Sequence, residues 1–186
     1  MVTKYQDAPG ELEFVRGFVN TLDVEGGADE FSTPASLAQW LAARGLLDAG
    51  GRAEKDELRH AIAVRAALRA VLLANNGGAG DPAAAATLDE AGSRAGLVLR
   101  FLPDGSVRHE PTAGGVDGAL GRLLAIVAAA QAEGAWARLK ACRNGGCQWA
   151  FYDHARNRSR AWCSMEVCGN RAKARAYRSR QSATGR

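Results

Sequence analysis

Apolar side chains recur every three to four residues in several stretches before residue 134, which places them on one face of a helix. The clearest stretch carries Leu58, Ile62, Arg65 and Leu68 at this spacing and ends at the helix-terminating run Asn76-Gly77-Gly78. Two other stretches begin with a proline that follows a capping Thr or Asp, a typical helix start. We therefore expect helices over residues 11–23, 34–45, 54–75, 81–95 and 116–133.

Between the fourth and the fifth of these helices the pattern changes to that of two strands. Residues 97–102 and 106–109 flank the turn Pro103-Asp104-Gly105, which predicts a β-hairpin. Because an isolated hairpin is marginally stable in water, we expect it to pack against the helices. The predicted fold is α+β and mainly α: a helical body with one small antiparallel hairpin sheet, followed by a small C-terminal module.

Charge divides the chain into two parts. Residues 1–137 hold 12 Lys and Arg against 18 Asp and Glu, a formal charge of −6, whereas residues 138–186 hold 12 Lys and Arg against 2 Asp and Glu, a charge of +10. This division predicts two domains, 1–137 and 138–186, with different partners. The basic part is expected to bind a polyanion, and the α-rich acidic part to sense a small molecule or bind a protein.

Two classes of function are disfavoured. No run approaches the about 20 uninterrupted apolar residues of a membrane-spanning helix, and no secretory signal is visible, so we expect a cytoplasmic protein without membrane contact. No Gly-rich phosphate loop, nucleophile elbow or H-E-x-x-H motif occurs, and His60 and His109 are well separated. We therefore expect no enzymatic activity. We interpret His60 as a histidine at the surface or edge of its helix.

The strongest chemical signal is a pair of C-x4-C motifs, in which Cys142 and Cys147 are separated by fifteen residues from Cys163 and Cys168. Two close thiolate pairs can supply the tetrahedral ligands of one structural Zn²⁺ ion. Two disulfides or four free buried cysteines are the alternatives, although nothing in the sequence indicates an oxidising compartment. His154 lies between the pairs and is not needed as a ligand.

Local sequence around the cysteines predicts how the module folds. Gly145 and Gly146 follow Asn144, so we expect the first pair to fold back through a turn in which glycine adopts positive φ. Ser164 is expected to cap a helix whose first turn carries Cys168. Since so small a segment cannot bury much, the expected mini-core consists of its aromatic residues: Trp149, Phe151, Tyr152 and Trp162.

Basic residues gather on both sides of the second cysteine pair. On a helix, Arg171, Arg175 and Arg178 share one face, while Lys173 and Arg180 lie on a neighbouring stripe. A solvated basic face is the ordinary alternative, but the charge excess favours polyanion binding over simple solvation. A short helix leading out of a zinc site suits the major groove of DNA, whereas RNA-binding modules more often expose stacking aromatics, so we expect DNA over RNA. The predicted DNA-binding residues are Arg156, Arg158, Arg160, Asn170, Arg171, Lys173, Arg175, Arg178 and Arg180.

The acidic part offers one weaker candidate site. Asn20, Thr21 and Asp23 are polar residues near the end of the first predicted helix, where they could line a ligand pocket. Helix capping explains the same residues equally well.

The run Cys168-Gly169-Asn170-Arg171 resembles the signature of the CGNR zinc-finger family, and further segments resemble the rest of that pattern: 139–144, 151–153, 156–160, 162–165 and 171–175. Upstream, residues 18–23 and 33–41 resemble the start of the ABATE domain that commonly precedes this finger. The resemblance implies a bacterial, cytoplasmic, stress-responsive transcription regulator, with the four cysteines as zinc ligands and DNA as the partner.

Together these observations predict a nucleoid-associated regulator in which a ligand or partner of the N-terminal domain changes how the finger is presented to DNA. One alternative is an RNA-binding or protein-interaction module whose zinc is purely structural. Another is a thiol sensor that releases zinc on oxidation. The DNA sequence, the signal and the oligomeric state, homo-oligomer or monomer, are left open.

Overall fold

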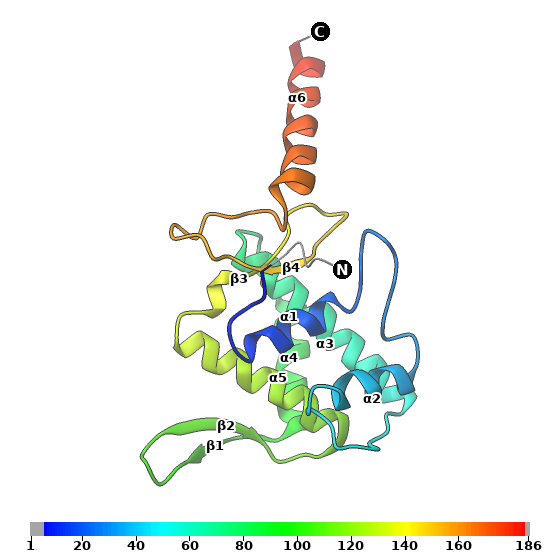
Figure 1. Ribbon diagram of the computed structural model, residues 1–186, viewed down its shortest axis with the longest axis vertical. Helices are drawn as coiled ribbons and strands as arrows, with labels where there is room; N and C mark the ends of the chain where they lie inside the picture. The colour runs from blue at the N-terminus through cyan, green and yellow to red at the C-terminus, as the bar shows by residue number, and fades with distance from the viewer. Residues whose placement is uncertain (1–5, 185–186) are drawn as a thin grey trace.

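The computed structural model describes residues 6–184, apart from the side chains of Arg180 and of residues 182–184. It is mainly helical, as the sequence predicts, and it contains two small antiparallel sheets, of which the sequence predicts only the first (Figure 1). The elements are α1 (Leu12–Asn20), α2 (Pro34–Ala42), α3 (Lys55–Asn75), α4 (Pro82–Ala95), β1 (Leu97–Phe101), β2 (Val107–Pro111), α5 (Gly115–Ala132), the 3-10 turn η1 (Trp136–Arg138), β3 (Leu139–Ala141), β4 (Ala150–Tyr152), the π-helical turn η2 (Met165–Gly169) and α6 (Asn170–Thr184).

Helix starts follow the capping chemistry expected from the sequence. The Thr33 hydroxyl accepts a hydrogen bond from the backbone N–H of Ser36 (3.1 Å) at the start of α2. The Asp81 carboxylate accepts bonds from the N–H groups of Ala83 and Ala84 at the start of α4. These side chains satisfy N–H groups that a helix leaves without partners, which fixes where each helix begins.

The core of the body lies between α1, α2, α3 and α5. Phe18, Phe31 and Trp40 form an aromatic cluster with ring centroids 5.5–5.7 Å apart, and all three are buried. Helix α5 is long and apolar enough to cross a membrane by length and composition. However, Val116, Leu120 and Leu123 are fully buried in this core, as in the core helix of a folded domain.

Two buried arginines of α3 hold the segment that follows α1. Arg65 is 2% exposed and donates to both carboxylate oxygens of Asp29 (2.6 and 2.7 Å). Arg69 donates to the carbonyl oxygens of Val19 (2.5 Å) and Leu22 (3.1 Å). Hydrogen bonds from Arg65 lower the pKa of Asp29 below the usual carboxyl range, so this carboxyl group is ionised at neutral pH.

The predicted hairpin exists as β1 and β2, but only its base packs against the helices. At that base, a methyl group on Gly121 of α5 would lie 2.8 Å from Pro111, so only glycine permits the close approach. Farther out, Leu99 and Phe101 are 56% and 74% exposed, and the hairpin projects from the body (Figure 1). The expectation that the hairpin packs against the helices is therefore confirmed at its base, and from there the two strands extend beyond the helices.

The second sheet, β3–β4, lies where the body meets the C-terminal part and has two different faces. Leu139, Ala141, Ala150 and Tyr152 belong to the body core, whereas Phe151 packs against the four cysteines. Alternate residues of a strand point to opposite sides, so a sheet of three residues per strand serves both cores.

Replacing Arg65 with methionine should lower the free energy of unfolding by about 2–3 kcal/mol, because the charged hydrogen bonds to Asp29 are lost. Arg59 on the same helix pairs with Asp56 at the surface, with side-chain exposures of 71% and 82%. Arg59→Met should therefore cost under about 1 kcal/mol. Urea denaturation of both variants measures the difference, and equal losses would contradict a structural role for the buried pair.

Candidate metal centre and nucleic-acid interface

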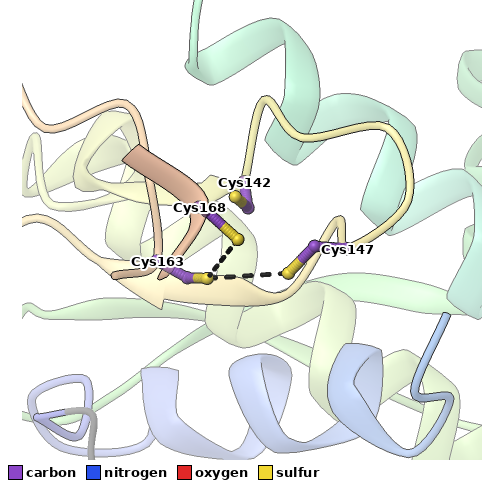
Figure 2. Close-up of side chains that lie close together, drawn as sticks. All are labelled: Cys142, Cys147, Cys163 and Cys168. Carbon is purple, nitrogen blue, oxygen red and sulfur yellow. Dashed lines mark hydrogen bonds between the residues drawn. The ribbon is translucent and has the colours of Figure 1, made fainter. Parts of the chain in front are cut away.

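The four cysteines come together from two segments that lie apart in the sequence. All their sulfur atoms lie within 4.8 Å of one another, and Cys163 Sγ is 3.6 Å from Cys147 Sγ and 3.8 Å from Cys168 Sγ (Figure 2). Cys147, at 8% exposure, is the most accessible, while the others are at most 2% exposed. Four buried thiols thus face a common centre.

The geometry of this cluster fits one tetrahedral zinc ion. With Zn–S distances of about 2.3 Å, the sulfur atoms of such a site are about 3.8 Å apart, close to the separations between these cysteines. The separations are far longer than the about 2.05 Å of a disulfide bond. The donor set, four cysteine sulfurs, is also that of structural zinc sites.

The thiols of the cluster also hydrogen-bond to one another, which shifts their pKa values in opposite directions. Hydrogen bonds from the Cys147 and Cys163 thiols lower the pKa of Cys142 to about 2. The pKa of Cys147 is raised to about 12 and that of Cys163 is also raised, mainly because each donates its proton to Cys142. Without a cation one thiol therefore carries the charge and its neighbours stay protonated, whereas a divalent ion would stabilise several thiolates together.

The first cysteine pair is shaped by a turn that differs in detail from the expected one. The N–H groups of Cys147 and Gln148 both donate to the Asn144 carbonyl oxygen (2.8 and 3.0 Å). Positive φ occurs at Gln148 (49°) and not at Gly145 or Gly146, so the expected use of these glycines is wrong. The side-chain amide of Asn144 points back to the cluster and donates to Cys168 Sγ (3.6 Å).

The second pair lies at the start of the C-terminal helix. As expected, the Ser164 hydroxyl accepts a bond from the Val167 N–H (3.3 Å) and caps η2, which carries Cys168 and continues into α6. A methyl group on Gly169 would lie 2.6 Å from Met165 Sδ. The glycine of the Cys168-Gly169-Asn170-Arg171 run is therefore explained by close packing of this turn.

Aromatic packing around the cluster follows the two faces of the β3–β4 sheet. Phe151 is 1% exposed beside the sulfur atoms, and Trp149 and Trp162 pack there while partly exposed. Tyr152 points to the other face and packs in the body core, with its ring 4.8 Å from that of His154. The expectation that all four aromatics form one mini-core is wrong for Tyr152, because strand alternation sends neighbours to opposite sides.

A buried ion pair orders the arginine-rich loop 154–160, and sequence reasoning missed it. Lys140 Nζ donates to Asp153 Oδ2 (2.7 Å) and to the carbonyl oxygens of Arg158 (2.6 Å) and Arg160 (3.3 Å). Burial alone would raise the pKa of Asp153, but hydrogen bonds from Lys140 and from backbone N–H groups lower it overall. The only sign of this ion pair in the sequence is an isolated lysine, Lys140, between the apolar residues of β3.

The predicted DNA-binding residues fall into two groups. Arg156 and Arg158 are exposed in the loop, whereas the guanidinium group of Arg160 donates to the carbonyl oxygens of Trp162 and Cys163 and lies over the Phe151 ring. The second group is exposed on α6: Asn170, Arg171, Lys173, Arg175 and Arg178. The side chain of Arg180, also predicted to contact DNA, lies outside the described residues.

Side-chain hydrogen bonds at the end of α3 join the body to the finger. Asn76 follows α3 and donates to the carbonyl oxygens of Ala141 (2.8 Å) and Ala161 (2.9 Å), so it touches the backbone near both cysteine pairs. In return, Arg143 Nε donates to the Asn76 carbonyl oxygen at the end of α3 (2.5 Å). Sequence reasoning read Asn76 only as a helix terminator.

The three polar residues at the end of α1 and just after it, Asn20, Thr21 and Asp23, all have hydrogen-bond partners within the chain. Asn20 donates to the Ala150 carbonyl oxygen (2.9 Å) and accepts from the Ala150 N–H (2.8 Å), which fastens β4 to α1. Thr21 donates to the Phe18 carbonyl oxygen (2.8 Å) and accepts from Arg65. Asp23 lines a hollow of about 250 Å³ next to Cys147, together with Glu25 and Trp149.

His60, interpreted from the sequence as a histidine at the surface or edge of its helix, has a side chain only 9% exposed. Its Nε2 lies 4.0 Å from Asp117 Oδ1 of α5. Burial, and secondly the nearby Arg94, lower the pKa of His60, so it is neutral at pH 7. The surface interpretation is wrong, because α5 covers this side of α3.

Comparisons with known proteins agree with this architecture. Residues 138–181 match the family model of the CGNR zinc finger, and residues 14–137 match that of ABATE, described as "putative stress-induced transcription regulator". Neither description names a class of enzyme. No curated protein matches the chain significantly.

Cys163→Ser should abolish stoichiometric zinc binding, since it removes one of four thiolates, while Ser159→Ala in the same segment should leave one zinc ion per chain. Elemental analysis of protein purified reduced and without chelators gives the ratio. Full zinc content in the Cys163 variant would contradict a site with four cysteine ligands.

Asn144→Ala should weaken zinc binding by about 10- to 100-fold, because a hydrogen bond to a ligand orients it and tunes its charge. Asn157→Ala, in the exposed loop, is the control and should leave the affinity unchanged. Competition with a chromophoric zinc chelator measures both. Equal affinities would show that the contact with Cys168 has no role in metal binding.

Proposed function

The chain belongs to the ABATE family and carries a C-terminal CGNR zinc finger, and we propose that it is a transcription regulator that binds DNA through this finger. The observation that carries the proposal is the position of α6. This helix begins at the cysteine cluster and projects from the body with its basic side chains in solvent (Figure 1). A basic helix on a firm base suits insertion into the major groove of DNA.

In this proposal one structural Zn²⁺ ion is held by Cys142, Cys147, Cys163 and Cys168. The mutual distances of the sulfur atoms and the burial of the cluster support it. The ion supplies folding free energy to a segment that is too small to bury a sufficient core. Because all four positions are taken by cysteine, no open coordination site is left for a reaction, and we assign no catalytic role.

The proposed DNA contacts combine two surfaces. Arg171, Arg175 and Arg178 follow one face of α6, with Asn170 and Lys173 beside them, and the exposed Arg156 and Arg158 lie in the loop that Lys140 holds. Arg180, which helical spacing in the sequence groups with Lys173, is also a proposed contact. Arg160 is engaged within the finger, so its proposed role is to hold the loop and not to contact DNA directly.

The body, residues 1–137, is proposed to sense a ligand or partner and to alter the presentation of the finger, residues 138–186. Contacts from Asn20 and Asn76 to the finger backbone support a connection between the two parts. A cytoplasmic, nucleoid-associated regulator of a bacterial stress response fits these features. Asn20, Thr21 and Asp23 remain proposed ligand contacts, with the hollow beside Asp23 as the place to look.

Two other functions make different predictions. An RNA-binding or protein-interaction module would use the same zinc site as a scaffold. A thiol sensor would lose zinc on oxidation, and Cys147, the most exposed ligand, would react first. Zinc release by peroxide together with loss of DNA binding would favour the thiol sensor, whereas equal affinity for RNA and DNA would favour the RNA-binding module.

For zinc-loaded protein on duplex DNA, affinity should fall as salt rises, with a log–log slope of about −0.9 for each phosphate contact. Lys173→Gln and Arg175→Gln should each weaken binding and reduce the magnitude of that slope by about 0.9. Arg52→Gln removes the same charge from the body and is the control. Fluorescence anisotropy across a salt series measures these values, and unchanged slopes for the α6 variants would contradict the proposed interface.

A further inference from the structure

A short turn of the acidic body, residues 23–27, reaches the base of α6, and we call it the acidic turn. Its geometry is ordered, because the Asp23 carboxylate accepts bonds from the N–H groups of Glu25 (3.0 Å) and Gly26 (2.9 Å). The Gly27 N–H donates to the Asp23 carbonyl oxygen (2.8 Å) and closes the turn. Just beyond it, Asp29 is fixed by Arg65. Glu25 is thus presented by a well-held segment.

Glu25 forms an ion pair with Arg171 in the first turn of α6. The two residues are 146 positions apart in the sequence, so this contact joins the body to the DNA-binding helix. Both side chains are about half-exposed, at 44% for Glu25 and 50% for Arg171. A solvent-exposed pair of this kind is weak and exchanges readily with other ions.

A carboxylate and a phosphate compete for the same guanidinium group. Arginine binds either anion through its guanidinium N–H donors, and Glu25 holds Nη1, so a DNA phosphate that approaches this side of Arg171 competes with Glu25. Asp23 adds a second negative charge to the turn, which also repels the DNA backbone at short range. The body therefore places a substitute for phosphate at the first basic residue of the proposed DNA-binding face.

A second interpretation of the Glu25–Arg171 contact predicts the opposite effect on DNA binding. A carboxylate near the N-terminus of α6 interacts favourably with the helix dipole, so Glu25 could simply hold the helix in position for DNA. Removing Glu25 would then weaken DNA binding. The exposure of the pair and the like charge of DNA favour competition, because the helix is already started by Ser164 and the cysteine cluster.

We propose that the acidic turn is a built-in competitor of DNA phosphate for Arg171, through which the body holds the DNA affinity of the finger below its full value. This inference rests on the DNA-binding function proposed above. A ligand or partner that draws the turn away from α6 would raise affinity without changing the finger itself.

The test compares Glu25→Gln with Glu30→Gln in the full, zinc-loaded chain. Glu30 lies in the same loop, is exposed and forms no ion pair within the part of the chain that the structure describes, so both variants remove one equivalent charge. Glu25→Gln should tighten binding to a mixed-sequence duplex by about two- to fivefold and steepen the salt slope by up to about 0.9. Glu30→Gln should change neither by as much. Equal effects, or weaker binding by the Glu25 variant, would overturn the proposal.

Two further measurements separate this proposal from the DNA-binding function. In an Arg171→Gln background the Glu25 substitution should have no more effect than Glu30→Gln, since its competitor site is gone and only general charge repulsion is left; a larger gain for the Glu25 substitution there would overturn the proposal. The same series is measured with inorganic polyphosphate, a polyanion without bases. Wild-type protein that binds polyphosphate but not DNA would refute the DNA role alone, while absence of a gain for Glu25→Gln on polyphosphate would refute the competitor.

Discussion

The convergence of four sulfur atoms on one centre is the constraint on which the last quarter of the chain depends. Residues 138–186 carry 12 Lys and Arg and can bury few side chains beside Phe151, so charge repulsion opposes their folding. In the proposed zinc site, a metal ion that joins Cys142 and Cys147 to Cys163 and Cys168 would oppose that repulsion. Without it, Arg160 would lose the ordered carbonyl groups it binds, and α6 would lose its base.

The body supplies the other half of the support, through a sheet that belongs to both cores. Leu139, Ala141 and Ala150 are fully buried against the helices, while Phe151 on the opposite face touches the cysteines. Through Asn76, the end of α3 is in direct contact with the backbone of the finger. This contiguous packing is the physical link that the proposed sensing role of the body would use.

Much of this architecture could be predicted from the sequence, and the remainder depended on tertiary contacts. Capping residues and apolar periodicity gave the helices, and the C-x4-C spacing gave the cysteine cluster, because both signals are local. The partners of Asn20, Arg65 and Asn76 lie 36 to 130 residues away, so no local pattern reveals them. Two residues are recognisable in the sequence by their charge. Arg65 is a charged residue on an apolar helix stripe, and Lys140 is a charged residue within a buried strand.

The exposure of α6 explains its unusual composition. A helix of 15 residues is marginal on its own, and like charges four residues apart, such as Arg171 and Arg175, destabilise it further. Because solvent surrounds the helix beyond its first turns, its order must come from intrinsic propensity, which the interspersed alanines supply. In the proposed complex, DNA phosphates would turn this repulsion into attraction, so ordering of α6 and DNA binding would reinforce each other. The body's carboxylate at Arg171 stabilises the same end of the helix in the absence of DNA.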